Sequence, residues 1–422
     1  MADLTASAAP QAAGLTTADG RPLKAALAAA QMRAKRRAFF LVAPLLLFVV
    51  VTFILPIGQM LQRSVYHDGF SANAPNLVAW FAANPQGTEP DEAAFAALAE
   101  DMKSMKANKT AGEAGTRVNY TLAESRSLIT KTARGADKLE PPYKEAFLAI
   151  DPRWESPAVW QAMRSSASAY TADFYLIATD FERDDQGQLQ RVADNQRIYL
   201  YLFGKTFVLS GLITFICLLL AFPVAHLLAT LPMRWSNLLM ILVLLPFWTS
   251  LLVRTTSWIV LLQGQGVINN ILVAIGLVSE DGRLAMIYNE LGTIIVMTHI
   301  LLPFMILPLY SVMRVIPPSY ARAARSLGAT SWTTFRRVYL PQTLPGIAAG
   351  SLLVFILAVG YYITPALVGG ADGQLISNLI SFHMTKSNWS LAAALAAMLL
   401  TAILLLYWLY DRLIGIDRLK LG

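Results

Sequence analysis

Apolar runs of roughly twenty residues recur along this chain and are separated by shorter polar segments. A helix of this length crosses the roughly 30 Å hydrocarbon core of a bilayer. The pattern therefore predicts an all-α polytopic membrane protein with six transmembrane helices. The predicted spans cover residues 38–60, 204–231, 237–262, 289–313, 342–369 and 391–411.

One long segment, 61–203, breaks this pattern between the first two spans. Apolar residues recur in it at helical spacing over 93–105 and 157–175. A segment of this length supports a small domain, and aromatic residues supply its expected core: Trp154, Trp160, Phe174 and Tyr175. The other predicted parts are an N-terminal tail, a five-helix core with one long inner loop, and a C-terminal tail: 1–37, 204–411, 314–341 and 412–422.

Composition and charge support the membrane assignment and add an orientation. The 422 residues are 55% hydrophobic and only 14% charged, whereas soluble domains carry about a quarter charged residues. The net charge of +7 divides into −4 over residues 61–200, which hold 19 of the 27 acids and 15 of the 34 bases, and +11 elsewhere. The bases gather in the tails and in alternate loops, so the positive-inside rule places both termini in the cytoplasm and segment 61–203 outside. The basic excess is thus a topology signal, and we expect no nucleic-acid partner.

The loop 314–341 carries an ordered set of helix signals. Pro317 ends the preceding span, and Ser319 is a suitable N-cap for a short helix over 320–327. Gly328 suits the left-handed residue that stops such a helix. The first half of the loop is therefore predicted to be a helix that ends at a glycine.

The second half of the loop predicts another short helix. Ser331 is a suitable cap, and Pro341 is expected to end this helix just before the next span. Trp332, Phe335 and Val338 fall three residues apart and so share one face. The whole loop is thus predicted to form a helix–glycine–helix elbow on the cytoplasmic surface.

At this loop the chain resembles the inner-membrane permease subunits of binding-protein-dependent ABC importers. Their cytoplasmic signature runs Glu-Ala-Ala, three residues, Gly, and then an apolar tail with prolines. The resemblance extends from about residue 203 to the C-terminus and includes the first span, but it does not cover 61–200. The matching residues are Ala323, Ala324, Gly328, Ala329, Phe335, Val338, Leu340, Pro341, Pro345 and Gly346.

The resemblance implies the six-helix fold of type I ABC importer permeases in a bacterial inner membrane, with 61–203 as a large extracytoplasmic insertion. In that family the loop is a coupling helix that seats in a groove of a cytoplasmic ATPase dimer. The resemblance also implies a second permease subunit, in a heterodimer or a homodimer, and a periplasmic solute-binding protein, with lipid around the spans. The implied coupling residues are Arg322, Ala323, Ala324, Arg325, Gly328, Ala329, Phe335, Val338 and Pro341.

The energy for transport is expected to come from the partner ATPase. The sequence contains no Gly-x-x-x-x-Gly-Lys-Ser/Thr phosphate loop. We therefore expect a transport subunit that is not an enzyme and binds no cofactor, with ATP held by the partner.

Arg322 stands where the family has a glutamate. With Ser319 as N-cap, residue 322 is the N3 position, where a glutamate completes a capping box and favours the helix dipole by about 0.3–1 kcal/mol. An arginine forfeits both effects. We therefore expect Arg322 to pair with a carboxylate of the ATPase groove or with anionic lipid.

Two stretches, 245–255 and 360–370, resemble the polyamine branch of the family, which takes up putrescine and spermidine. Aromatic rings can hold a cation in a translocation path, and the same residues are also typical of helix packing. Arg254 is expected mainly to brace a helix pair. The candidate path residues are Arg254, Trp258, Tyr361, Tyr362 and Thr364.

Other functions remain open at this point. Related permeases carry ferric ion, sulfate, opines or other small organic ions. A receptor or anchor that displays 61–203 explains the outer segment but not the inner elbow. An integral-membrane enzyme is disfavoured, because His226 and His299 have no acidic companions for a metal site. A secondary transporter would need coupling-ion carboxylates within the spans.

Overall fold

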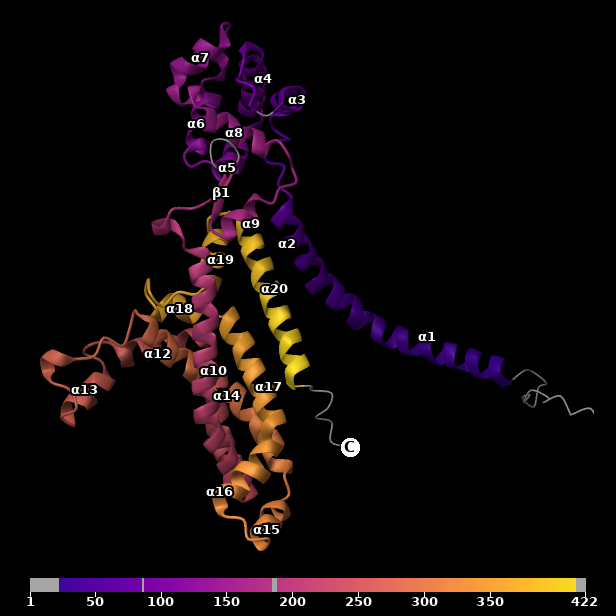
Figure 1. The fold of residues 1–422 in the computed structure, drawn as a ribbon, viewed down its shortest axis with the longest axis vertical. Helices are drawn as coiled ribbons and strands as arrows, with labels where there is room; N and C mark the ends of the chain where they lie inside the picture. The colour runs from indigo at the N-terminus through magenta and orange to yellow at the C-terminus, as the bar shows by residue number, and fades with distance from the viewer. Residues whose placement is uncertain (1–22, 86, 184–187, 415–422) are drawn as a thin grey trace, which may run out of the picture. The chain divides into compact units, whose positions relative to one another are not determined.

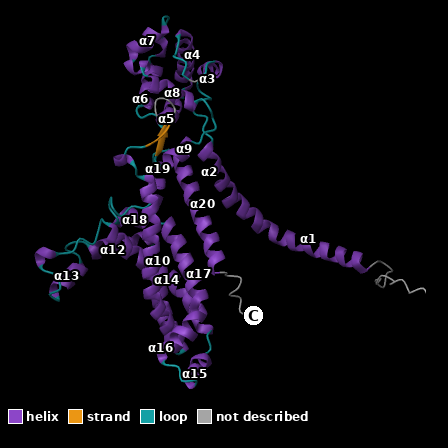
Figure 2. Ribbon diagram, viewed as in Figure 1, coloured by secondary structure: helices purple, strands orange, loops and turns teal. Residues whose placement is uncertain are grey.

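The computed structural model describes residues 23–85, 87–183 and 188–414, and most of them are helical (Figure 2). The chain divides into two compact units, Met1–Gln62 and Arg63–Gly422. Within the described residues, six helical segments are long and apolar enough to cross a membrane, which is the predicted number. These segments are Ala30–Val65, Tyr199–Thr230, Leu251–Ala274, Glu290–Val315, Ser331–Gly360 and Trp389–Arg412.

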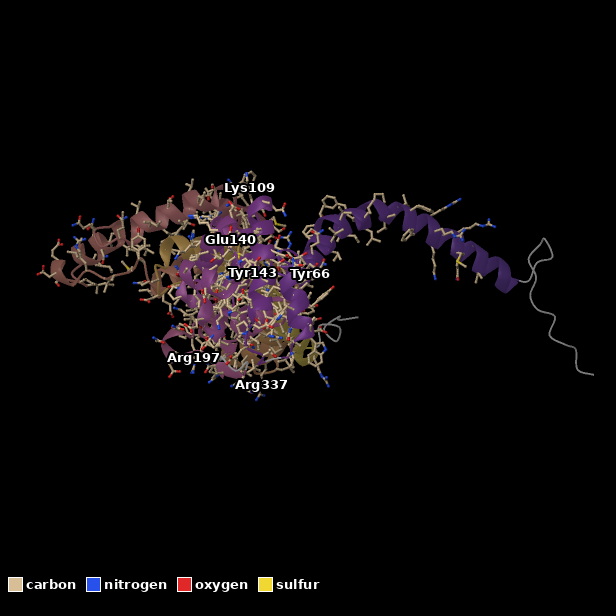
Figure 3. All side chains as sticks on the ribbon, turned by 90° about the horizontal axis from the view of Figure 1, so that it is seen from above. Tyr66, Lys109, Glu140, Tyr143, Arg197 and Arg337 are labelled. Atoms are coloured by element: carbon tan, nitrogen blue, oxygen red, sulfur yellow. The ribbon has the colours of Figure 1, made fainter. Side chains whose placement is uncertain are left out.

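The first span is longer than predicted. Helix α1 (Leu23–Val49) passes through a π-helical turn (Val50–Ile54) into α2 (Leu55–Val65), so the predicted span 38–60 lies inside one helical segment. The predicted tail is helical over residues 23–37, because alanine, leucine and lysine favour the helix. Residues 1–22 of the tail lie outside the described residues. The side chains of the first span point outward around its axis (Figure 3).

The segment after the first span folds as short helices around its own core. Of the four predicted core aromatics, Trp154 and Trp160 lie in this core and are 0% and 5% exposed, whereas Phe174 is buried in a separate cluster. The helices are α3 (Pro75–Ala83), α4 (Glu92–Asn108), α5 (Ala111–Asn119), α6 (Ser125–Arg134), α7 (Tyr143–Ile150), α8 (Pro157–Ser166) and α9 (Asp173–Ala178), with 3-10 turns at Ala136–Lys138, Pro152–Glu155 and Asp194–Gln196.

One hairpin departs from the predicted all-α fold. Strands β1 (Phe181–Arg183) and β2 (Leu189–Arg191) pair antiparallel, with Phe181 opposite Arg191. Two strands this short add little stability by themselves. They bring the chain back to the start of the second span.

Three long helices, α10 (Tyr199–Thr230), α14 (Glu290–Val315) and α17 (Leu340–Gly360), pack side by side (Figure 1). Small residues let two of them approach closely. A Cβ on Gly346 would lie 3.1 Å from the Pro308 carbonyl oxygen, and a Cβ on Gly350 would lie 2.7 Å from the Met305 sulfur. Glycines four residues apart, Gly346 and Gly350, thus let α17 pack closely against α14.

The prediction that residues 237–262 form the third span as one continuous helix is wrong. Helix α11 (Met233–Leu244) runs into a 3-10 turn (Leu245–Trp248), and a separate helix α12 (Leu251–Leu262) begins after an extended residue, Thr249. Pro246 has no N–H to continue the helical ladder. The span-length segment here instead joins α12 to α13 (Val267–Ala274).

The fifth span ends earlier than predicted. Helix α17 stops at Gly360, where residues up to 369 were expected to continue it, and Tyr361 is extended. The chain then forms three further helices: α18 (Ile363–Val368), α19 (Ile376–Thr385) and α20 (Trp389–Ile414). Residues 412–414 of the predicted C-terminal tail are helical, and 415–422 lie outside the described residues.

The segment 63–198 and the helices that follow it share a core within the second unit. Phe174 and Ala178 of α9 pack in one buried cluster with Val359, Leu391 and Leu395. The Asp180 carboxylate, from a residue that is 3% exposed, accepts backbone N–H bonds from Ile198 (3.2 Å), Tyr199 (3.1 Å) and Leu200 (2.9 Å). A carboxylate thus satisfies the N–H groups at the start of α10, where the helix dipole favours negative charge.

Candidate functional site

The loop between the fourth and fifth spans forms the predicted elbow with different caps. Helix α15 (Pro318–Ser326) begins after Pro317, which makes no side-chain cap, so Ser319 lies inside the helix and the prediction that it caps is wrong. The proline at N1 already has the backbone angle that a helix start requires. Gly328 has φ +88°, which confirms the predicted left-handed stop.

The second half of the elbow has no stop at Pro341. Thr330, and not Ser331, caps α16 (Ser331–Thr334) through a 3.2 Å bond from the Thr333 N–H. A π-helical turn (Phe335–Tyr339) then leads directly into α17. Pro341 lies in the first turn of α17, where its missing N–H costs little, so the helix continues through it.

These caps change the explanation of Arg322. With Pro317 as N-cap, N3 is Tyr320, so Arg322 lies beyond the position where a glutamate would complete a capping box. Its side chain is exposed, and it makes no hydrogen bond or ion pair within the described residues. Arg325 is also exposed and bonds back to the Ala321 carbonyl of its own helix at 3.3 Å.

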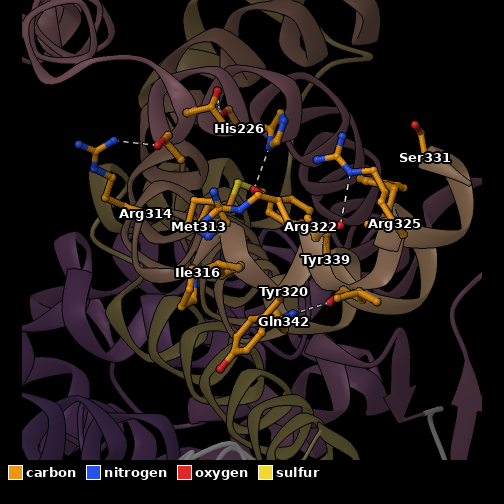
Figure 4. A pocket seen from close by; sticks show the side chains of 18 residues that line it. His226, Met313, Arg314, Ile316, Tyr320, Arg322, Arg325, Ser331, Tyr339 and Gln342 are labelled. Atoms are coloured by element: carbon orange, nitrogen blue, oxygen red, sulfur yellow. Dashed lines mark hydrogen bonds between the residues drawn. The ribbon is translucent and has the colours of Figure 1, made fainter. Parts of the chain in front are cut away.

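A pocket of about 820 Å³ lies between this elbow and the ends of α10 and α14 (Figure 4). Its wall includes Arg314, Arg322 and Arg325, together with Tyr320 and Tyr339. No acidic side chain is among the described residues that line it. The pocket is therefore cationic, with polar donors and an apolar remainder.

Two contacts tie the elbow region to the span ends. His226 Nδ1 and the Tyr339 hydroxyl lie 2.8 Å apart, which links α10 to the π-helical turn. The Arg314 guanidinium donates to the carbonyl oxygens of Ala229 (2.8 Å) and Leu231 (3.4 Å) and so caps the C-terminal end of α10. Sequence reasoning missed both contacts, and the only signal for them was a histidine near the inner end of a predicted span.

Aromatic stacking supports the second helix of the elbow. The rings of Trp332 and Phe335 stack with centroids 5.7 Å apart, and Phe222 of α10 meets Phe335 edge-on at 5.9 Å. The predicted shared face of Trp332 and Phe335 is therefore present. The π-helical turn changes the spacing after it.

Among the candidate path residues, Arg254 contacts the helix break. Its guanidinium donates to the carbonyl oxygens of Pro246 and Thr249 (3.1 Å for Thr249). These carbonyls lie where the ladder between α11 and α12 is interrupted. The Pro246 carbonyl oxygen also accepts from the Thr249 hydroxyl (2.8 Å), so the arginine adds to the pairing of Pro246 and supplies a partner for the Thr249 carbonyl oxygen.

The other candidate path residues lie around α12, α18 and α19. Trp258 Nε1 donates to His299 Nδ1 at 3.0 Å. The hydroxyl oxygens of Thr255 and Thr364 lie 3.5 Å apart, and both residues are fully buried. Trp258 and Tyr361 pack against the same buried cluster.

The two tyrosines of the predicted path differ in exposure. The Ser377 hydroxyl and the Asn378 side-chain amide of α19 donate to the carbonyl oxygens of Tyr361 (2.5 Å) and Tyr362 (2.7 Å). These bonds pair backbone carbonyls at the point where helix α17 ends. Tyr362 is 45% exposed, whereas Tyr361 is half-buried. The structure thus brings Trp258 and Tyr361 together and leaves the Tyr362 ring at the surface.

These features define a polytopic helical membrane protein with a helical elbow between its fourth and fifth spans. Residues 193–414 match the family described as binding-protein-dependent transport system inner membrane component. The match covers more than half of the chain, so the chain belongs to this family. It is a multi-pass inner-membrane permease subunit of an ABC importer, which confirms the resemblance seen at the loop.

The chain is similar to curated proteins named spermidine/putrescine transport system permease protein PotB. The one from Haemophilus influenzae is 38% identical over 216 residues, which cover 51% of this chain and 75% of that protein. The one from Escherichia coli K12 is 34% identical over 258 residues, which cover 58% of this chain and 93% of that protein. A solved bacterial ABC transporter that imports alginate is 19% identical with a TM-score of 0.47, over 69% of this chain and 98% of that one.

Proposed function

We propose that this chain is the permease subunit of a polyamine importer and forms part of the path for putrescine or spermidine. The observation that carries this proposal is the identity of 34–38% with PotB proteins over most of their length. The family match over residues 193–414 includes the helix break that Arg254 contacts and the aromatic residues Trp258 and Tyr361. Aromatic rings favour a cationic solute.

Uptake of labelled putrescine and spermidine by cells with and without this chain tests the substrate. We expect ATP-dependent uptake of at least one of them only when the chain is present. Labelled sulfate is the comparison solute, because a sulfate permease of E. coli, CysT, is 30% identical over 122 residues. Sulfate uptake without polyamine uptake would refute the polyamine assignment.

We also propose that the elbow is the coupling surface for a cytoplasmic ATPase, which places both termini in the cytoplasm and segment 61–203 outside. Exposed apolar side chains support this proposal. Leu327 is 89% exposed, Trp332 67% and Tyr320 52%, and they flank the exposed turn at Gly328. Large apolar side chains at an exposed turn favour a protein partner.

Co-purification with the ATPase tests the coupling surface. Leu327→Asp places a charge where an apolar anchor would be buried, and we expect the ATPase to be lost from the complex. Ser326→Asp is the matched control, because it introduces the same charge at the neighbouring exposed residue. Equal retention of the ATPase by both variants would exclude Leu327 from the contact.

The remaining partners follow from the same assignment. A second permease subunit, as a heterodimer or homodimer, would complete the path, and a periplasmic binding protein would deliver the solute. Segment 61–203 is the proposed docking site for that binding protein, and the implied topology places it on the same side. Crosslinking of the binding protein to surface cysteines introduced in α4 or α7 tests this role, and crosslinks confined to the loops between the other spans would contradict it.

A further inference from the structure

The pocket behind the elbow contains guanidinium groups that no acidic side chain among its described lining residues neutralises. The Arg314 guanidinium donates to the carbonyl oxygens at the end of α10, and Arg325 donates only its Nε–H, to the Ala321 carbonyl oxygen. Arg322 has no hydrogen bond or ion pair in the described part of the chain. Since the described lining residues include no carboxylate, nothing there neutralises these two exposed guanidinium groups.

A buried hydroxyl in the same pocket also lacks a partner. Thr334 is 6% exposed, and its Oγ1 makes no hydrogen bond among the described residues. A buried hydroxyl without a partner costs free energy unless a bound group satisfies it. Thr334 lines the pocket with the arginines, so a ligand with acceptor oxygens would satisfy both kinds of donor at once.

The position and the apolar part of the pocket indicate where such a ligand comes from. The wall includes Thr230 at the C-terminal end of α10 and Met313 and Arg314 near the end of α14, which are ends of spans. Met313, Ile316 and Val338 add an apolar surface beside the charges. Basic pockets between helices at this depth bind phosphate-bearing lipid headgroups.

We propose that the pocket binds a phosphate ester, that of an anionic phospholipid headgroup, through Arg322, Arg325 and Thr334. Bound there, the phosphate bridges α15, which carries both arginines, to α16, which carries Thr334. The lipid then ties the two helices of the elbow to each other beside the ends of the spans. This site does not depend on which solute the permease carries.

Native mass spectrometry of the full-length chain, titrated with phosphatidylglycerol or phosphatidylcholine, tests the proposal. The wild-type chain is expected to retain phosphatidylglycerol in preference to phosphatidylcholine. R322Q/R325Q is expected to weaken phosphatidylglycerol binding by about tenfold or more, because each charge-assisted bond to phosphate is strong. R322K/R325K keeps the charges, and retained binding in that variant shows that the glutamine effect is not misfolding.

R336Q/R337Q is the matched control. Arg336 and Arg337 are exposed residues of the same loop (Figure 3 labels Arg337) but do not line the pocket. Loss of binding confined to the Arg322 and Arg325 pair supports the site. Equal loss in both pairs, or equal binding of the two lipids, overturns it.

A soluble arm separates the two sources of phosphate. Glycerol 3-phosphate binding with the same dependence on Arg322 and Arg325 supports the phosphate site and assigns it to a free anion. Unchanged lipid binding together with loss of the ATPase in R322Q/R325Q overturns the proposal in favour of a carboxylate of the protein partner.

Discussion

Replacing Asp180 tests how the segment 63–198 holds the second span. Its carboxylate accepts three backbone N–H bonds at the start of α10 while its own backbone is left-handed, with φ +58°. The two features predict different outcomes for different replacements. Alanine removes the acceptor and is strained at this φ, glycine removes the acceptor without strain, and asparagine keeps one acceptor oxygen and tolerates the conformation.

The magnitudes follow from these contacts. Loss of a buried charged acceptor for three N–H groups costs about 3 kcal/mol, because a helix start that is part-exposed recovers some bonds to water. The left-handed backbone adds about 1 kcal/mol for alanine. We therefore expect the loss of stability to be largest for Asp180→Ala, smaller for Asp180→Gly, and smallest, about 1 kcal/mol, for Asp180→Asn.

Hydrogen–deuterium exchange of a peptide that covers residues 195–203 measures this loss locally. A loss of about 3 kcal/mol corresponds to amide exchange roughly a hundredfold faster at Tyr199 and Leu200. The control is Asp194→Ala, which removes a highly exposed carboxylate that pairs with Arg197 nearby and should change exchange little. Wild-type exchange rates in both Asp180→Ala and Asp180→Gly would refute the claim that this carboxylate holds the start of α10.

Three further predictions concern the elbow, the helix packing and the segment 61–203. Gly328→Ala meets no atom within 4 Å but must adopt φ +88°, so we expect a local cost of about 1 kcal/mol and slower ATP-dependent uptake, with Gly328→Asn closer to wild type. Gly350→Val crowds Met305 and should destabilise the chain by about 1–3 kcal/mol, visible as earlier thermal unfolding in detergent; an unchanged midpoint would contradict close packing. Burial and then the charge of Arg117 lower the pKa of His67 below its ordinary 6.5. Its neutral form therefore stabilises the fold above about pH 6.5, and this contribution is lost as the pH falls below that value. His67→Gln should flatten the decline of stability between pH 7.5 and 5, as measured by tryptophan fluorescence during urea unfolding.

The sequence was sufficient for the number of spans and for the elbow, because both depend on local signals. A span is recognised from the length of its own apolar run, and the left-handed backbone at residue 328 is recognised from the glycine itself. The same local rules misplaced the caps. Ser319 and Ser331 are each adjacent to a better start, a proline at N1 in one case and Thr330 in the other.

The errors in the third and fifth spans have a different cause. Hydropathy is continuous across residues 237–262, so it cannot report that Pro246 interrupts the helix. The Thr249 carbonyl at this break accepts from Arg254, and the carbonyls of Tyr361 and Tyr362 after Gly360 accept from Ser377 and Asn378. These partners come from later residues or from another helix, and only the folded arrangement brings them into contact.

The continuity of the elbow with the fifth span bears on how motion would pass through the protein. The π-helical turn runs into α17 without a stop at Pro341, so α16 and α17 are continuous along the helical backbone. Gly346 and Gly350 let α17 pack closely against α14. The Tyr339 hydroxyl, in the π-helical turn, contacts His226 of α10. The other end of α17 is also packed, since Val359 lies in a buried cluster with Leu391 and Leu395, and the helix ends at Gly360. We infer that motion started at the elbow would emerge at the break beside Tyr361 and Tyr362, the residues proposed to line the path.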